Sequence, residues 1–233
     1  MSGSGTADAL EEFTMEAASM RPSEYACLRE VLRDLKPKRT LEIGMANGTS
    51  TLVCCQIVRE VGGERHTAVD PFQSKENGWK GQGIKKVQEA GFGDLLEVVE
   101  DFDYNALPML VKEGRKFDFV LIDGYHSFDY TFLDMFYADL LLEKGGVLAC
   151  HDTGYPCVFK ALRFLETHKP YERIGPPIAQ MYASPARKVL RRLGQVVFGT
   201  MAEAKERREV WHALGAWKKL DDHQVAEDHP ILF

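Results

Sequence analysis

The sequence lacks the features that mark secreted, membrane-spanning and disulfide-stapled proteins. No apolar run approaches the roughly 20 residues that cross a bilayer, and no basic and then apolar leader opens the chain. The five cysteines are odd in number and include no C-x-x-C pair, so we expect reduced, mostly buried thiols and no zinc or redox site built from cysteines. These absences predict a cytoplasmic protein with no membrane partner.

An excess of positive charge is also absent. The 29 lysines and arginines are outnumbered by 35 aspartates and glutamates, which gives a net charge of −6 and a pI of about 5.7. Polyphosphate backbones are bound through clustered basic groups, so nucleic acid is not an expected partner. A small molecule is the expected partner, and the sequence leaves open whether the chain forms a homo-oligomer.

The sequence does contain a regular alternation of short apolar and longer amphipathic segments. Strands are expected at 39–43, 66–69, 95–99, 117–122 and 146–150. Helices are expected between them at 49–61, 81–90, 106–113 and 130–142. The alternation predicts an α/β fold of the Rossmann-like, doubly wound type, with a mostly parallel sheet covered by helices on both faces.

The two ends of the chain are less regular. Helices are expected at 7–18 and 25–35, with Ser23 as the N-cap of the second and Pro37 beyond its end. A further helix from Pro156 to His168 and a weak strand at 171–174 follow the main alternation. Residues 186–207 have a basic helical pattern, and 210–220 are expected to form the seventh strand, with Gly215 as a bulge or bend.

A ligand-binding turn follows the first expected strand, in the segment LEIGMANGTS. Glu42 lies at the strand end, and Gly44 begins a turn in which a ligand approaches the backbone closely. A dinucleotide site favours G-x-G-x-x-G, but the second glycine position is Ala46. Glu42 instead suits a ligand with positive charge, such as the amino and sulfonium groups of S-adenosylmethionine, and Asp70 at the end of the next strand suits the two hydroxyls of a ribose.

These segments resemble the class I S-adenosylmethionine-dependent methyltransferases, through L-E-I-G-x-x-x-G, V-D-P and the acidic end of the third strand. The resemblance implies that the loop after that strand contacts the adenine. It also implies that 37–233 form the methyltransferase domain, with 177–233 completing the sheet and a lid, and that 1–36 form helices on the acceptor side. The candidate cofactor-binding residues are Glu42, Gly44, Asn47, Gly48, Thr49, Ser50, Asp70, Asp101, Phe102 and Asp123.

Ionisable groups follow two further strands. Asp123 and His126 come after the strand at 117–122, while His151 and Asp152 come after the next strand. Because parallel strands end at the same edge of a sheet, we expect these four groups to meet beside the cofactor turn. Two aspartates and a histidine can hold a divalent cation that lowers the pKa of an acceptor hydroxyl. An ordinary histidine pKa near 6.5 suits His126 to act as the base.

This pattern is similar to that of the metal-dependent O-methyltransferases, and within them to the enzymes that act on sugars of macrolide antibiotics, whose I-D-G-x-H block carries a histidine base. The resemblance spans about residues 39–165. It implies that Asp123, His151 and Asp152 bind magnesium or manganese, that His126 is the base, and that the methyl group goes to a hydroxyl oxygen of a sugar or phenolic natural product. His151 stands where those enzymes carry a carboxylate, which leaves the metal in question because imidazole suits manganese better than magnesium.

Other interpretations stay open. Asp123 with Gly124 also suits a simple turn, and Asp152 also suits a helix cap. A nicotinamide-dependent oxidoreductase shares the strand, glycine turn and helix, and a non-catalytic adenosyl-binding protein keeps the fold without the chemistry. An N-methyltransferase is a further alternative.

Overall fold

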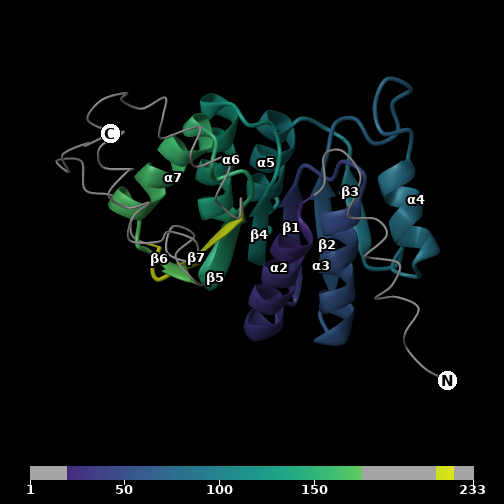
Figure 1. Ribbon diagram of the computed structural model, residues 1–233, viewed down its shortest axis with the longest axis horizontal. Helices are drawn as coiled ribbons and strands as arrows, with labels where there is room; N and C mark the ends of the chain where they lie inside the picture. The colour runs from purple at the N-terminus through teal and green to yellow at the C-terminus, as the bar shows by residue number, and fades with distance from the viewer. Residues whose placement is uncertain (1–19, 175–213, 223–233) are drawn as a thin grey trace, which may run out of the picture.

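A single sheet organises the described part of the chain. The computed structural model describes residues 20–174 and 214–222, and Figure 1 shows their arrangement. Seven strands follow the order β3-β2-β1-β4-β5-β7-β6. The strands are β1 Arg39–Ile43, β2 Arg65–Val69, β3 Leu96–Val99, β4 Phe117–Ile122, β5 Leu142–Cys150, β6 Tyr171–Ile174 and β7 Gly215–Lys219. Strands β1 to β5 pair in parallel and β7 runs antiparallel to both of its neighbours, so the predicted mostly parallel α/β sheet is confirmed.

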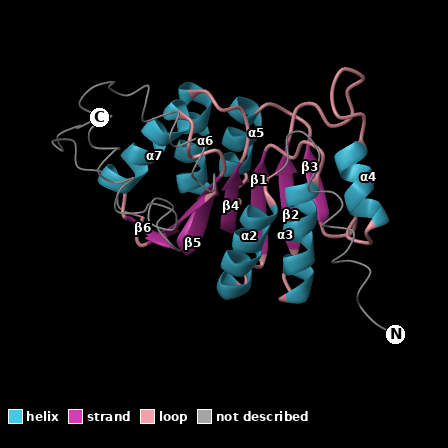
Figure 2. Ribbon diagram, in the orientation of Figure 1, coloured by secondary structure: helices cyan, strands magenta, loops and turns pink. Residues whose placement is uncertain are grey.

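Helices cover both faces of this sheet, as Figure 2 shows by colour. The helices are α2 Pro22–Leu35, α3 Thr49–Glu60, α4 Gln82–Glu89, α5 Asp103–Lys112, α6 Phe128–Leu141 and α7 Pro156–His168. Helices α2 and α3 share one apolar cluster with the sheet, α4 packs beside α3, and α5, α6 and α7 share the cluster on the opposite face. None of the helices within these two ranges is long and apolar enough to cross a membrane.

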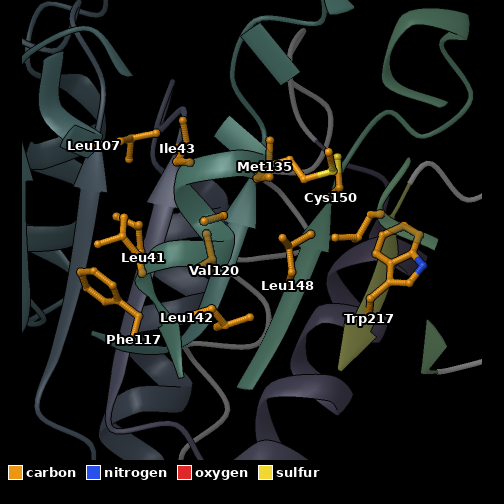
Figure 3. Packing of buried hydrophobic residues seen from close by; sticks show 14 of the residues in the cluster. Leu41, Ile43, Leu107, Phe117, Val120, Met135, Leu142, Leu148, Cys150 and Trp217 are labelled. Carbon is orange, nitrogen blue, oxygen red and sulfur yellow. The ribbon is translucent and has the colours of Figure 1, made fainter. Parts of the chain in front are cut away.

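The strands supply both clusters because successive side chains point to opposite faces. On β4, Val120 and Ile122 belong to the cluster under α5 to α7, while Phe119 and Leu121 belong to the cluster under α2 and α3. Figure 3 shows the first of these clusters, including Val120 and the indole of Trp217 from β7. The near-continuous burial of β4 is therefore the pattern of a central parallel strand.

The start of α2 differs from the sequence prediction. Arg21 is the N-cap, and Ser23 lies inside the first turn, so the expected Ser23 cap is wrong. Pro22 takes the first helical position, where its missing N–H costs nothing. Glu24, at the third position, accepts the Arg21 N–H at 2.6 Å and closes half of a capping box.

Other boundaries also differ from the prediction, among them the start of β5 at Leu142 instead of residue 146, and part of the prediction cannot be compared. Gly215 begins β7 in regular antiparallel register with Cys150, so it is not a bulge. Helix α5 begins three residues before the expected position, at Asp103. The expected helices at 7–18 and 186–207, residues 210–213 and the lid lie outside the described residues.

The strand tips at the carboxyl edge are joined to one another by backbone hydrogen bonds. The N–H of Gly44 donates to Val69 O at 2.9 Å, and that of Asp123 donates to Ile43 O at 2.8 Å. The N–H of His151 donates to Ile122 O at 2.9 Å. These bonds continue the sheet pairing by one residue and place the β1, β4 and β5 loops side by side.

We expect Gly44→Ala to destabilise the protein much more than Gly62→Ala. Both glycines have positive φ, but a Cβ on Gly44 would overlap the carbonyl of Asp123, whereas a Cβ on Gly62 would meet nothing within 4 Å. Gly62→Ala should therefore lower the free energy of unfolding by about 1–2 kcal/mol through backbone strain alone. Urea unfolding of both variants measures the difference, and equal losses would contradict the close approach of β1 and β4 tips.

Candidate active site

A cavity of about 760 Å³ opens at the carboxyl edge of the sheet. This volume is typical of small-molecule sites, and its position is where open parallel sheets bind ligands. Every central strand contributes to its wall through the loop that follows it. Contributing residues include Gly44, Asp70, Phe102, Asp123, His126 and Asp152.

The turn after β1, residues 44–48, is held by one buried carboxylate. Asp70 accepts hydrogen bonds from the backbone N–H groups of Met45 at 3.2 Å and Ala46 at 2.9 Å. It also accepts the side-chain amide of Gln73 at 3.1 Å and the N–H of Phe72 at 2.8 Å. Ala46 has φ +47°, a left-handed conformation that an alanine rarely adopts without such support. Asp70 therefore both fixes the turn and lines the cavity.

Glu42 lies below the turn, on the α3 side of the sheet. It is fully buried, and its Oε2 accepts the Thr51 hydroxyl at 2.5 Å and lies 3.2 Å from His66 Nε2. Its Oε1 has no partner among residues 20–174 and 214–222. The structure does not bring Glu42 to the cavity wall, although the sequence predicted a direct cofactor contact.

The predicted cofactor-binding residues thus divide into two groups. Gly44, Asp70, Phe102 and Asp123 line the cavity. The remaining six are not among the residues that line it: Glu42, Asn47, Gly48, Thr49, Ser50 and Asp101.

In the loop after β3, the aspartate that lines the cavity is not the one that the sequence predicted. Asp101 is exposed, and its Oδ1 accepts the Phe102 N–H at 2.7 Å and the Asn105 side-chain amide at 3.0 Å, just before the start of α5. Asp103 lines the cavity instead. Phe102 also lines it, stacked on Tyr104 with ring centroids 5.1 Å apart.

Behind Asp103 lies a second carboxyl group that the sequence analysis missed. Asp134 of α6 is fully buried, and neither of its carboxyl oxygens has a hydrogen-bond partner among the described residues. Burial, followed by the negative charge of Asp103, raises the pKa of Asp134 well above its ordinary value. The buried Asp134 carboxyl therefore favours its neutral, protonated form beside Asp103. An aspartate between Leu133 and Met135 on a helix predicted to be amphipathic was the available signal.

The four ionisable groups predicted at the β4 and β5 tips do meet, and we call Asp123, His126, His151 and Asp152 the strand-tip cluster. His126 Nε2 lies 3.0 Å from Asp152 Oδ2, and His151 Nδ1 lies 3.0 Å from Asp123 Oδ1. His151 Nδ1 is also 3.8 Å from Asp152 Oδ2. All four line the cavity, so the predicted convergence of carboxylates and imidazoles is what the structure shows.

A fifth member comes from α2 and was not predicted. Glu24 is 1% exposed, and its Oε2 lies 3.3 Å from His151 Nε2. Nothing in the spacing of the sequence links residue 24 to residue 151, because only the packing of α2 against the sheet brings them together. Residues 1–36 were expected on the acceptor side, and Glu24 is the residue of that segment that contacts His151.

Burial and neighbouring charges shift the pKa values of the cluster residues in different directions. Burial acts to lower the pKa of His151, but the hydrogen bond and charge of Asp123, followed by the hydrogen bond of Glu24, raise it to about 10. Burial acts to raise the pKa of Asp152, but the hydrogen bond from His126 and the charge of His151 bring it below its ordinary value. Burial raises the pKa of Asp123. At neutral pH the cluster therefore holds a charged imidazolium at His151 and a carboxylate at Asp152.

His126 is the more accessible of the two histidines. Its side chain is 36% exposed, compared with 12% for His151. Its ring stacks on Tyr155, with centroids 5.4 Å apart and an interplanar angle of 8°. Asp152 holds one ring nitrogen, and no residue within the described ranges holds the other, so His126 is oriented but still available to a ligand.

The donors predicted to bind a metal do not fit that role in their observed arrangement. A histidine binds a metal through a ring nitrogen that carries no proton, but both nitrogens of His151 face carboxylates, Asp123 on one side and Glu24 on the other. Across the described ranges no group of three or more histidine, cysteine, aspartate or glutamate side chains is arranged to hold a metal ion.

Comparisons with known proteins agree with the fold. The family described as Methyltransferase domain matches residues 41–153. No curated protein matches the sequence. Among solved structures, cofactor-bound Rv0187 from MTB is similar with a TM-score of 0.63 and 17% identity, covering 92% of this chain and 88% of that one.

Two further similar structures are named as O-methyltransferases. TomG from Streptomyces achromogenes, involved in tomaymycin synthesis and in complex with S-adenosylmethionine, has a TM-score of 0.59 and 20% identity over 72% of this chain and 78% of its own. The O-methyltransferase from Bacillus cereus, bound to S-adenosylhomocysteine, has a TM-score of 0.59 and 18% identity over 72% of this chain and 80% of its own.

The sequence match spans the turn after β1 through the tip of β5, which are the segments that build the cavity. The match to the family described as Methyltransferase domain covers residues 41–153, and together with the Rossmann-like sheet it supports the predicted class I S-adenosylmethionine-dependent methyltransferase.

We expect Asp134→Asn to be more stable than the wild type at neutral and alkaline pH. Because the folded-state pKa of Asp134 is raised, its contribution to stability is complete below the unfolded pKa near 3.9 and is lost as pH rises towards the folded value. Asparagine does not titrate, so it avoids the cost of a buried charge at this position.

The check is urea unfolding of Asp134→Asn and the wild type from about pH 5 to about pH 8. The advantage of the variant should grow with pH. Asp129→Asn, at an exposed position of the same helix whose pKa is lowered by Ser127, is the control and should gain no stability with pH. A pH-independent difference for Asp134→Asn would contradict the protonated carboxyl.

Proposed function

We propose that this protein transfers a methyl group from S-adenosylmethionine to a hydroxyl oxygen of a small molecule, a sugar or a phenolic natural product, with His126 as the general base. The observation that carries the proposal is the 3.0 Å contact between His126 Nε2 and Asp152 Oδ2 at the wall of the cavity. A histidine oriented by a carboxylate is the arrangement used to remove a proton from a hydroxyl. The O-methyltransferases of similar fold support an oxygen acceptor.

The turn at residues 44–48 and the ends of β2 and β3 would hold the donor. Gly44 leaves the backbone open to a ligand, since a side chain there would fill the space against the β4 tip. Asp70 and Asp103 present carboxylates at the wall, and Phe102 presents an aromatic ring. These groups suit the amino and hydroxyl groups and the flat base of an adenosyl compound.

The bound donor supplies a methyl group that its sulfonium makes electrophilic. His126 would take the proton from the acceptor hydroxyl as the oxygen attacks the methyl carbon. The carboxylate of Asp152 would then stabilise the imidazolium that forms on His126, at a distance of 3.0 Å. The His126 proton is released to solvent through the exposed part of the ring before the next turnover.

Besides removing the proton, the protein must hold the two reactants in position. Displacement at carbon needs the acceptor oxygen aligned with the methyl group, and holding two reactants in place supplies a large part of a rate enhancement. The stacked Tyr155 restricts the ring of His126, and the β4 and β5 tips are tied by the bond from His151 N–H to Ile122 O. We infer that the Tyr125 side chain, 71% exposed at the rim, contacts the acceptor.

Calorimetric titration tests the donor. We expect the protein to bind S-adenosylhomocysteine and to show no binding of NAD, because the 44–48 turn has Ala46 at the second glycine position of a dinucleotide site. Wild-type protein that binds S-adenosylhomocysteine should also transfer a labelled methyl group to members of a panel of phenols and sugars. Binding of NAD alone would favour the oxidoreductase alternative, and binding of S-adenosylhomocysteine with methylation of amines alone would favour N-methyl transfer.

Variants of the His126 and Asp152 pair test the chemistry. His126→Gln and Asp152→Asn should each lower kcat by about 100-fold or more while leaving the affinity for S-adenosylhomocysteine nearly unchanged. Asparagine is chosen because Asp152 has φ +51°, a conformation that asparagine tolerates better than alanine does. The rate of His126→Gln should also lose the rise with pH that a titrating base imposes.

The outcome that would remove His126 as the base is a reduction of the same size at every pH from about 6 to about 9. Parallel loss of donor affinity and kcat would instead place the pair in the donor site. Glu30→Gln, an exposed change on α2, serves as the control and should leave both quantities unchanged.

A further inference from the structure

The neighbourhood of His151 has the composition of a cation site, and the inference that follows rests on the proposed function. Three carboxylate groups surround one imidazole ring. Asp123 Oδ1 lies 3.0 Å from Nδ1, Glu24 Oε2 lies 3.3 Å from Nε2, and Asp152 Oδ2 lies 3.8 Å from Nδ1. They come from the β4 tip, from α2 and from the β5 tip, so the ring sits where three separate elements converge.

The geometry determines the protonation of the ring. A carboxylate oxygen accepts hydrogen bonds and donates none, so each ring nitrogen that contacts one must carry a hydrogen. With Asp123 on Nδ1 and Glu24 on Nε2, His151 donates from both nitrogens and is an imidazolium.

His151 gives the neighbouring acids the compensating positive charge that a metal ion would otherwise supply. Buried carboxylates are costly unless a positive charge and hydrogen bonds compensate them, and Glu24 and Asp123 are 2% and 19% exposed at their side chains. Glu24 is itself fixed, because it also accepts the Arg21 N–H at the start of α2. His151 therefore contributes one positive charge to a set of acids that would otherwise attract a cation from solution.

We propose that His151, held between Asp123 and Glu24, takes the place of the divalent cation expected from the resemblance to metal-dependent enzymes, so that this protein transfers its methyl group without a metal. Glu24 is then a positioning residue, since it acts on the acceptor site through His151. The carboxylate of Asp152 remains directed at His126, the group that removes the acceptor proton. The proposed metal-free site differs from the metal-dependent site at one residue, because position 151 carries an imidazole in place of a carboxylate.

Manganese binding tests this directly and needs no acceptor. Electron paramagnetic resonance of free Mn²⁺, titrated into protein saturated with S-adenosylhomocysteine, should show no stoichiometric uptake by the wild type. His151→Asp should take up about one Mn²⁺ per chain, because it replaces a cation by a third carboxylate beside Asp123 and Asp152. Lys160→Asp makes the same change of charge at an exposed position of α7 and should take up none.

Activity supplies the second readout. Wild-type transfer should be unchanged by a chelator and by added magnesium or manganese, whereas His151→Asp should depend on added Mn²⁺ for any transfer it retains. Glu24→Gln should raise KM for the acceptor or lower kcat by about tenfold while S-adenosylhomocysteine still binds, and Glu30→Gln should do neither.

Each outcome decides the question. Uptake of one Mn²⁺ by the wild type, abolished in Asp123→Asn, would overturn the proposal, as would loss of wild-type transfer on chelation. If His151→Asp fails to fold, the wild-type titration still decides. If no hydroxyl acceptor is methylated at all, the proposed function fails while the Mn²⁺ titration continues to report on the cation site.

Discussion

The structure depends on the backbone pairing that joins the tips of β1, β4 and β5. The N–H groups of Gly44, Asp123 and His151 each donate to the end of the neighbouring strand, at 2.8 or 2.9 Å. The strand-tip cluster of Asp123, His126, His151 and Asp152 lies within three residues of those bonds. The loops after β2 and β3 and Glu24 of α2 also reach the site, but they lie farther from these bonds along the chain. A hydrogen-bonded sheet edge is rigid, so carboxylates and imidazoles placed on it keep their separations without support from flexible loops.

The site balances its charges with protons held inside the protein. Burial favours the protonated form of Asp134 beside Asp103 on one side of the cavity, and the carboxylates of Asp123 and Glu24 favour the protonated form of His151 on the other. The two protonated groups differ in charge. Burial favours the neutral form of the Asp134 acid, whereas carboxylate partners favour the charged form of the His151 base. One carboxylate lines the cavity on each side, Asp103 on the first and Asp152, in contact with His126, on the second.

Much of the fold could be predicted from periodicity, because strands such as 117–122 are apolar without interruption and the segments between them are amphipathic. The meeting of Asp123 with His151 could also be predicted, since parallel topology dictates it. Direct contact by Glu42 could not be judged, because the sequence does not say which face of β1 it occupies relative to the cavity. Glu24 and Asp134 were missed for a related reason: both reach the site through helix packing, which local patterns do not encode.

Glu24 also bears on where the functional unit begins. The segment shared with the methyltransferase family starts at residue 41, inside β1, and a boundary drawn there would retain the sheet and the strand-tip cluster. It would discard α2 and with it one of the two carboxylates that hold the His151 ring. Some relatives would share the strands and differ in the segment before them. Under the proposed function, such relatives would share a donor pocket and differ in the charge of their acceptor side. A function inferred from the common segment alone would miss that difference.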